Sequence, residues 1–203
     1  MLVVVGGHSR NIGKTSVAAG LIRSLRDMHW TAVKITQYGH GVCAHEGDAC
    51  GCETELDHPF ALTEEYGPGN ADSERFLAAG AERSFWLRTR TGELAGATAV
   101  IHKLLAQNRN VMIESNSVVE LVEPDLFLMV VDFACSDFKL SSRRMLHRAD
   151  ALVVISHGLD EPCWPDIDGR LWKDKLQFCV DPPDYVTPAV AAFVREKLAA
   201  SAV

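Results

Sequence analysis

A glycine-rich segment near the N-terminus reads Gly7-His8-Ser9-Arg10-Asn11-Ile12-Gly13-Lys14-Thr15-Ser16. The apolar run Val3–Val5 precedes it and an amphipathic pattern over Lys14–Arg26 follows it, which predicts a strand, a loop and a helix in that order. Glycines let the backbone N–H groups of such a loop turn toward one point, and the N-terminus of the helix adds partial positive charge. These properties suit the binding of phosphate groups.

The side chains of this segment favour the same chemistry. We expect Lys14 to reach the β- and γ-phosphates of a nucleotide and the hydroxyl of Thr15 to ligate Mg²⁺. The predicted nucleotide-binding residues are Gly7, Ser9, Arg10, Asn11, Ile12, Gly13, Lys14, Thr15 and Ser16. The two glycines stand one residue further apart than in the usual spacing, so a strand-to-helix turn with a surface lysine is the alternative.

Short apolar or β-branched runs alternate with helical patterns along the chain, which predicts an α/β fold with a three-layer, doubly wound, mostly parallel sheet. The predicted strands are Val3–Val5, Thr31–Ile35, Phe85–Leu87, Val111–Ile113, Leu126–Val131, Leu152–Ile155 and Leu176–Val180. The predicted helices are Lys14–Arg26, Ser73–Ala79, Gly92–Leu105, Ser141–His147 and Pro188–Ala199. We expect a single domain over residues 1–203, with a long insertion loop over residues 38–70 after the second strand.

Two charged residues stand at the predicted ends of strands. Lys34 lies near the end of the second predicted strand, and Glu114 follows the apolar run Val111–Ile113. Doubly wound sheets bind ligands at the carboxyl ends of their strands, so we expect Lys34 to face phosphate or an anionic substrate. The alternative for Lys34 is a solvated strand end.

Several segments resemble P-loop NTPases of the class that includes MinD, nitrogenase iron protein, dethiobiotin synthetase and MobB, and they are most similar to MobB. Dethiobiotin synthetases have a loop of the same length as residues 7–16. Residues 72–81, from Asp72 to Ala81, resemble the D-[ST]-x-R-x-x-x-A-G-A segment of MobB, although an N-capped helix with Asp72 or Ser73 as its cap also explains them. The strand ending in Glu114 resembles one whose acid acts on Mg²⁺ in these families.

The resemblance implies Mg²⁺-dependent binding and hydrolysis of ATP or GTP, with Lys14, Lys34 and Glu114 in catalytic roles and Mg²⁺ held by Thr15 and Glu114. It also implies an accessory role in metal-cofactor assembly, with a protein partner and a homodimer as candidate assemblies. One alternative is a ligase or kinase that acts on a small molecule, as dethiobiotin synthetase does. Another is a sensor of nucleotide or metal that does not hydrolyse. Of the guanine-recognition pattern [NT]-K-x-D, only the aspartate has a counterpart in this sequence, which is Asp160. The choice between ATP and GTP therefore stays open.

The predicted insertion is rich in metal-ligating side chains. Cys43, His45, Cys50 and Cys52 are candidate Zn²⁺ ligands, and Asp48 is a further candidate ligand of Mg²⁺. Their spacing matches no standard zinc finger or ribbon. Redox or iron–sulfur chemistry and a metal-free substrate loop are therefore the alternatives.

Composition excludes several other classes of protein. The 203 residues carry a formal net charge of −7, which gives no overall attraction to nucleic acid or to anionic lipid. The apolar runs are far shorter than the roughly 20 residues that a membrane-spanning helix needs. We therefore expect no nucleic-acid partner, no membrane span and, since the N-terminus lacks a basic leader pattern, a cytoplasmic location.

Overall fold

The computed structural model describes residues 1–39, 58–67, 69, 71–164 and 166–200. An eight-stranded sheet forms its centre, in the order β3-β4-β2-β5-β1-β6-β7-β8, and every neighbouring pair is parallel except β3 with β4. The strands are β1 (Leu2–Gly7), β2 (Thr31–Tyr38), β3 (Phe60–Glu65), β4 (Arg83–Arg90), β5 (Val111–Glu114), β6 (Leu126–Asp132), β7 (Ala151–Ile155) and β8 (Leu176–Val180).

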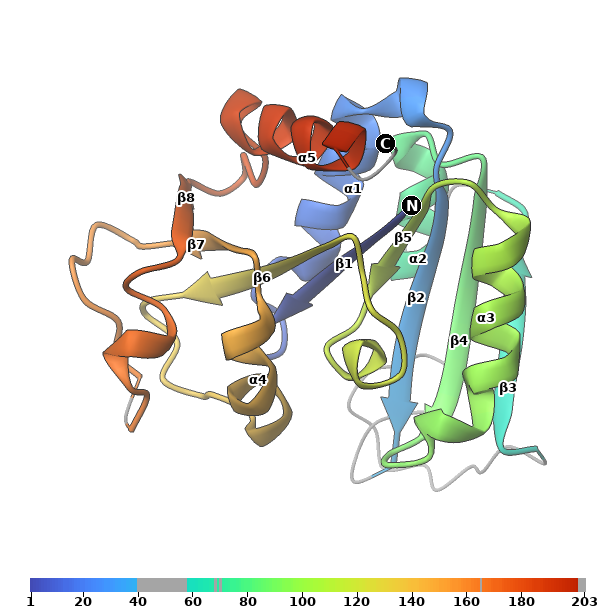
Figure 1. Cartoon of the computed structure of the whole chain (residues 1–203), viewed down its shortest axis with the longest axis horizontal. Coiled ribbons are helices and arrows are strands. Elements are labelled where there is room, and N and C mark those ends of the chain that lie inside the picture. Colours follow the sequence, from blue (N-terminus) through green and yellow to red (C-terminus); the bar gives the residue numbers. More distant parts are fainter. Residues whose placement is uncertain (40–57, 68, 70, 165, 201–203) are drawn as a thin grey trace.

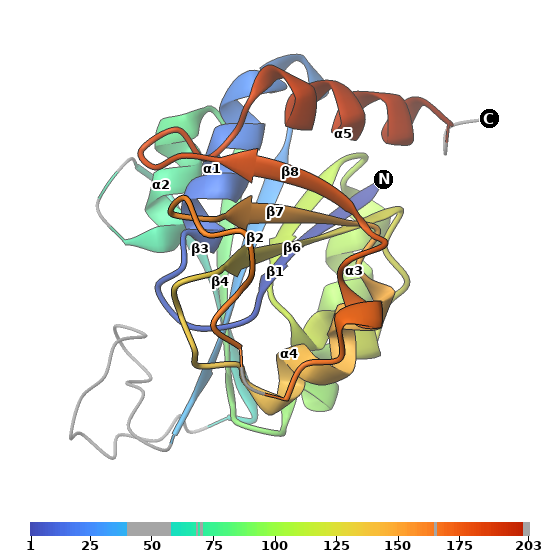
Figure 2. The same cartoon turned by 90° about the vertical axis from the view of Figure 1, so that its left-hand side faces the viewer.

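Helices cover both faces of this sheet. The α-helices are α1 (Lys14–Ser24), α2 (Asp72–Ala79), α3 (Thr98–Gln107), α4 (Leu140–Met145) and α5 (Pro188–Ala200). Short 3-10 helices are η1 (Arg26–Met28), η2 (Leu94–Ala97), η3 (Ser117–Glu120), η4 (Leu146–Arg148) and η5 (Gly169–Leu171). Helix α3 runs alongside β4 in Figure 1, and Figure 2 shows α5 and α4 on opposite sides of the strands β6 to β8.

Two hydrophobic cores follow from the alternation of side chains along the strands. On one side of the sheet Val3 and Val5 of β1 pack with α1, α2 and α5. On the other side Val4 packs with residues of α3, η3 and α4. A strand that is buried on both faces consists of continuous apolar residues, as β1 and β6 do. The predicted three-layer, doubly wound α/β architecture is confirmed.

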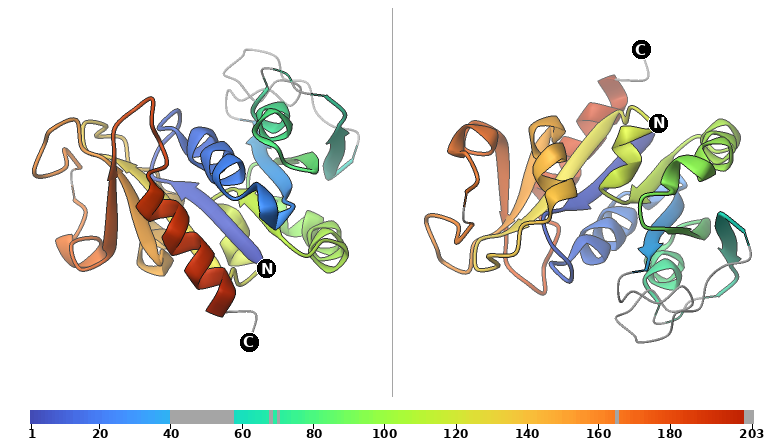
Figure 3. Two further views of the ribbon diagram at one scale, coloured as in Figure 1. Left: turned by 90° about the horizontal axis from the view of Figure 1, so that it is seen from above. Right: turned by 90° about the horizontal axis from the view of Figure 1, so that it is seen from below.

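The central strand β1 marks the point where the chain changes direction across the sheet. Strand β5 lies on one side of β1 and β6 on the other, so the loops that leave the carboxyl ends of these strands diverge around the end of β1. Such a switch point is where doubly wound sheets bind ligands. In Figure 1 the arrowhead of β2 points downward, and the right-hand view of Figure 3 shows the molecule from below, from the side of this strand end.

The predicted strands and helices are all present, with ends that shift by a few residues, but the prediction of a loop over residues 38–70 is wrong in two places. Tyr38 still belongs to β2, and Phe60–Glu65 form the edge strand β3, which pairs antiparallel with β4. From strand β3, only Phe60 and Leu62 contact the apolar core. An edge strand with so few core contacts needs no apolar run of the kind that identified the other strands. Among the described residues, no helix is long and apolar enough to span a bilayer.

Candidate functional site

The loop between β1 and α1 has the features of a phosphate site. Helix α1 begins at Lys14, and no side chain caps its N-terminus. Within the described residues, the backbone N–H groups of residues 9–16 donate to no acceptor, whereas that of Val17 donates to the carbonyl of Gly13. Gly13 has a φ of 88°, the left-handed conformation that glycine adopts without strain. The loop therefore presents unpaired amide donors at a helix N-terminus, where an anion binds favourably.

We call the loop between β1 and α1 the P-loop (residues 7–16). The side chain of Lys14 folds back over the start of the P-loop. Its Nζ donates to the carbonyl oxygen of Ser9 at 2.5 Å. A Cβ atom on Gly7 would lie 2.7 Å from Cγ of Lys14, so the backbone at this position has to be glycine for the lysine to take this path. Burial lowers the pKa of Lys14, and the positive charges of Lys34 and Arg10 lower it further, against the opposing effect of Glu114 and Asp72. An anion at this loop would relieve that repulsion.

Asn116, just after β5, fixes the first residue of the P-loop. Its Oδ1 accepts from the backbone N–H of Gly7 at 2.7 Å, and its Nδ2 donates to the carbonyl of Gly7 at 2.8 Å. Ser142 of α4 donates to the same carbonyl at 2.9 Å. One amide side chain thus satisfies both backbone polar groups of Gly7 at the end of a buried strand.

His8 and Ser9 attach the P-loop to the segment after β6. Nδ1 of His8 lies 3.0 Å from the carbonyl oxygen of Asp137, while the backbone N–H of Asp132 donates to Nε2 at 3.0 Å. The hydroxyl of Ser9 donates to the carboxylate of Asp137. Burial lowers the pKa of His8 to about 4, so its imidazole is neutral, with the proton on Nδ1. The ring also packs against Phe138 and Trp164.

Four polar side chains meet where β2, β5, α1 and α2 approach the P-loop. Nζ of Lys34 lies 2.5 Å from Oε1 of Glu114 and 2.7 Å from Oδ2 of Asp72. The hydroxyl of Thr15 donates to Oε2 of Glu114 at 2.8 Å and lies 3.4 Å from Nζ of Lys34. Burial alone would lower the pKa of Lys34, but the two carboxylates outweigh it and raise the pKa above its ordinary value.

The oxygens of this cluster fit the ligand preference of Mg²⁺. Thr15, Glu114 and Asp72 supply one hydroxyl and two carboxylates, the hard oxygen donors that Mg²⁺ prefers in proteins. These oxygens already face a cation, the ammonium of Lys34. Burial would raise the pKa of Asp72, but Lys34 and the hydroxyl of Thr15 lower it below its usual value, so the carboxylate is ionised.

Asp72 is a site residue for which the sequence suggested only capping of a helix. The N-cap of α2 is Ala71, and the carboxylate of Asp72 binds Lys34 instead. Arg75, one turn further along α2, contacts both Asp72 at 3.4 Å and the hydroxyl of Ser16 at 3.1 Å. The resemblance of residues 72–81 to a MobB segment was the sequence signal that marked this position. The predicted end of this helix at Ala79 is confirmed, since Gly80 follows it with a φ of 107°.

The other predicted site residues divide into three groups. Ser9 and Ile12 are buried, and Arg10 and Asn11 of the same loop are exposed, so only the latter two side chains face solvent. Asp160 is exposed in the segment after β7. Asp48 and the candidate zinc ligands Cys43, His45, Cys50 and Cys52 lie outside the described residues. In the part of the chain that the structure covers, no cluster of three or more metal-ligating side chains is present.

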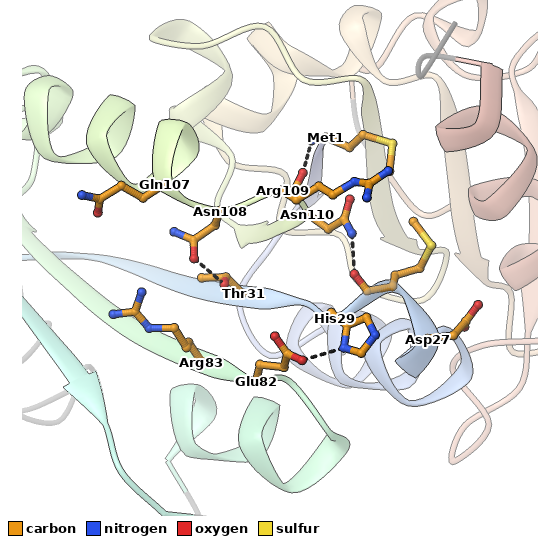
Figure 4. Close-up of a pocket in the computed structure, with 11 residues that line it drawn as sticks. Met1, Asp27, His29, Thr31, Glu82, Arg83, Gln107, Asn108, Arg109 and Asn110 are labelled. Carbon is orange, nitrogen blue, oxygen red and sulfur yellow. Dashed lines mark hydrogen bonds and ion pairs between the residues drawn. The ribbon is translucent and has the colours of Figure 1, made fainter.

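A cavity of about 420 Å³ lies at the opposite end of the sheet (Figure 4). Its lining includes Thr31 and Arg83 at the amino ends of β2 and β4, together with Asn110 just before β5. Asn108 accepts a hydrogen bond from Thr31 at 2.9 Å, and His29 lies against Glu82 at 2.6 Å. The cavity contains none of the P-loop residues and is separate from the candidate phosphate site.

Comparison with solved structures identifies the fold. HypB from Helicobacter pylori, solved in complex with nickel, aligns with a TM-score of 0.54 at 13% identity, over 98% of this chain and 86% of that one. LpxK from Aquifex aeolicus, solved in complex with ATP, aligns with a TM-score of 0.47 at 18% identity, over 88% of this chain and 53% of that one. The sequence matches no family profile and no curated protein. The likeness to HypB thus shows that the chain has a P-loop NTPase fold.

Proposed function

We propose that this protein binds a Mg²⁺-bound nucleoside triphosphate and hydrolyses it. The observation that carries the proposal is the convergence of unpaired amide donors of residues 9–16, the ammonium of Lys14 and the oxygens of Thr15 and Glu114 at one end of β1. In hydrolysis, water attacks the γ-phosphorus and the bond to the bridging oxygen breaks, which leaves a nucleoside diphosphate and inorganic phosphate. Mg²⁺ supplies neutralisation of the phosphate charge in this chemistry.

The residues of the chain have separate tasks in this proposal. The P-loop amides and Lys14 bind phosphate oxygens and hold them in place. Thr15, Glu114 and Asp72 would hold the metal ion. Lys34 neutralises the two carboxylates when no metal is bound, and it lies within 3.4 Å of Thr15, close enough to act on the same phosphates. Tyr185 packs against Gly13 and closes one side of the loop.

The test is nucleotide affinity measured by calorimetry for ATP and GTP, with Mg²⁺, in wild type and Lys14→Ala. We expect the variant to lose at least tenfold in affinity, because a charged hydrogen bond to phosphate is worth about 1.5–3 kcal/mol. Lys103→Ala is a matched control, since Lys103 is an exposed lysine on α3. Equal affinity of Lys14→Ala and wild type would overturn the proposal.

We further propose an accessory role in metal-cofactor assembly. Its support is the resemblance of residues 72–81 to MobB, together with the fold that the chain shares with the nickel-bound HypB. Metal analysis and nucleotide identification on protein purified without added ligands test this role. Slow phosphate release that a protein partner stimulates would support it, whereas release that depends stoichiometrically on a small molecule would point to a ligase or kinase.

In the ligase or kinase alternative, the turn after β5 would hold a small-molecule substrate beside the γ-phosphate. Such a role for Asn116 needs its side chain to be free. Instead, its Oδ1 and Nδ2 bind the backbone of Gly7, and Nδ2 also donates to the hydroxyl of Ser142 at 2.9 Å. This is why hydrolysis, rather than transfer to a small molecule, is the reaction that we propose.

A further inference from the structure

Lys139 comes from a distant part of the sequence but lies against the P-loop. It stands between β6 and α4, and its backbone N–H donates to the carbonyl of His8 at 3.0 Å. Two residues earlier, Asp137 accepts a hydrogen bond from Ser9 and its carbonyl lies 3.0 Å from Nδ1 of His8. Residues 137–139 are therefore held along one side of the loop by three hydrogen bonds.

The ammonium of Lys139 is a cation without a counter-charge of its own. Its side chain is half-buried, and no hydrogen bond or ion pair joins it to any residue in the described ranges. Burial, together with the positive charges of Lys14, Arg10 and Lys34, lowers its pKa to about 8, against the opposing effect of Asp137. The ammonium thus lies within electrostatic range of Lys14, Arg10 and Lys34 of the candidate phosphate site.

Lys139 does not stabilise helix α4, which begins directly after it. Lys139 is the N-cap of α4, where no side-chain hydrogen bond caps the helix. The N-terminus of a helix carries partial positive charge, so a cation there is unfavourable. Of the other site lysines, Lys34 has two carboxylates as partners, whereas Lys14 has only the carbonyl of Ser9. Two ammonium groups beside the P-loop therefore share an excess of positive charge that an anion would neutralise.

We propose that Lys139 is a further phosphate-binding residue, whose ammonium contacts the polyphosphate of the nucleotide held by the P-loop. This inference rests on the proposed function, because it needs a nucleotide in the loop. A triphosphate carries several negative charges, so it binds more favourably to the two ammonium groups of Lys14 and Lys139 than to one of them alone. The segment 137–139 thereby supplies a cation to the loop from the opposite side to Lys34, which reaches it from β2.

The first test is calorimetric binding of ATP, GTP and inorganic tripolyphosphate to wild type, Lys139→Ala, Lys139→Arg and the control Lys103→Ala. We expect Lys139→Ala to weaken binding of nucleotide and tripolyphosphate about 10- to 100-fold, and Lys139→Arg to retain most of the affinity. Circular dichroism checks that the variants fold, and Lys139→Gln replaces Lys139→Ala if that variant does not. Affinity of the alanine or glutamine variant equal to that of Lys103→Ala would overturn the inference.

The second test is proton uptake on binding at pH 8.5, obtained from calorimetry in two buffers of different ionisation enthalpy. Lys139 is largely neutral in the free protein at this pH, and a phosphate contact restores its charge. We expect wild type to take up at most about three-quarters of a proton per nucleotide at Lys139, and Lys139→Arg to take up much less, because arginine is always charged. Equal uptake by the two proteins would contradict the inference.

The two proposals fail in different ways. Wild type that binds neither nucleotide at any pH overturns the proposed function and, with it, the role of Lys139. Wild type that binds nucleotide through Lys14, with Lys139→Ala unchanged in affinity, overturns the role of Lys139 alone.

Discussion

Lys34 and Glu114 are the final register pair between two adjacent parallel strands, β2 and β5, and their charged atoms lie 2.5 Å apart. Glu114 is only 2% exposed and the side chain of Lys34 is 16% exposed, so this ion pair is largely removed from water. A buried carboxylate is tolerated only with a partner. Lys34 therefore supplies the partner that the buried Glu114 needs beside Thr15 in the absence of metal.

We predict that Lys34→Met destabilises the protein, because it leaves the charge of Glu114 buried without its partner. Removal of one member of such a pair typically costs about 3–5 kcal/mol in the free energy of unfolding. Urea denaturation measures this change. In Lys34→Met/Glu114→Gln neither position carries a charge, so Glu114 leaves no unpaired charge in the core, and we expect the double variant to be more stable than Lys34→Met. A double variant that is less stable than either single variant would show that the pair does not interact as described.

The P-loop and its flanking elements could be predicted from the sequence because their signals are local. A buried strand, a glycine-rich turn and an amphipathic helix follow one another within Val3–Arg26, and each has its own pattern. The parallel sheet followed from the alternation of apolar runs with helical patterns. The edge strand β3 could not be found in this way, because an edge strand with one partly buried face needs few apolar residues.

The positions of Asp72 and Lys139 beside the loop could not be predicted, because they depend on contacts between distant segments. Asp72 resembled a helix cap, since acidic residues favour helix N-termini, and only the packing of α2 beside β2 brings it to Lys34. Lys139 gave no sequence signal, because it belongs to no motif. Its position depends on the hydrogen bond from its backbone to His8 across the ends of β1 and β6.

We predict that Asn116→Ala weakens nucleotide binding without any contact between Asn116 and the nucleotide. The variant leaves the buried N–H of Gly7 without its acceptor, which costs about 1–3 kcal/mol in stability and loosens the start of the P-loop. Asn108→Ala is the matched control, since Asn108 binds Thr31 and the carbonyl of Leu104 at the other end of the sheet. The control should lose stability but keep its nucleotide affinity. Equal affinities of the two variants in calorimetry would contradict the prediction.

We predict that Gly13→Ala costs more stability than Gly92→Ala, although both glycines have a positive φ near 90°, at 88° and 86°. An added Cβ at Gly13 would lie 2.2 Å from Cε1 of Tyr185, whereas nothing lies within 4 Å of one at Gly92. The left-handed conformation alone costs an alanine about 1 kcal/mol, and the overlap with the ring adds to it.

A double-mutant cycle separates the two costs at Gly13. Removal of the ring in Tyr185→Ala should make the subsequent Gly13→Ala substitution cheaper by about 1 kcal/mol or more. Thermal or urea unfolding of the four proteins gives the interaction energy. An interaction energy of zero would mean that Tyr185 moves aside freely and does not close the loop.

The last prediction concerns His8 and the dependence of stability on pH. The pKa of His8 is about 4 in the folded protein, against an ordinary value of 6.5, because burial disfavours the charged imidazole. Between these values the unfolded chain binds more protons at this position than the folded protein does, so stability rises with pH across the window from 4 to 6.5. The contribution is complete above pH 7 and is progressively lost on acidification, by roughly 2 kcal/mol between pH 7 and pH 5.

The variant His8→Asn measures this contribution, because its amide keeps a donor for the carbonyl of Asp137 and does not titrate. Urea denaturation at pH 5, 6 and 7 gives the unfolding free energy of wild type and of His8→Asn. In the difference between the two proteins, the effect of the carboxylates that they share cancels. We expect wild type to lose about 2 kcal/mol more than the variant from pH 7 to pH 5. His102→Asn, at an exposed histidine on α3, should follow wild type at every pH. Parallel curves for wild type and His8→Asn would show that His8 has the same pKa in the folded and unfolded protein, and would contradict its role as a buried neutral group that holds the P-loop to Asp132 and Asp137.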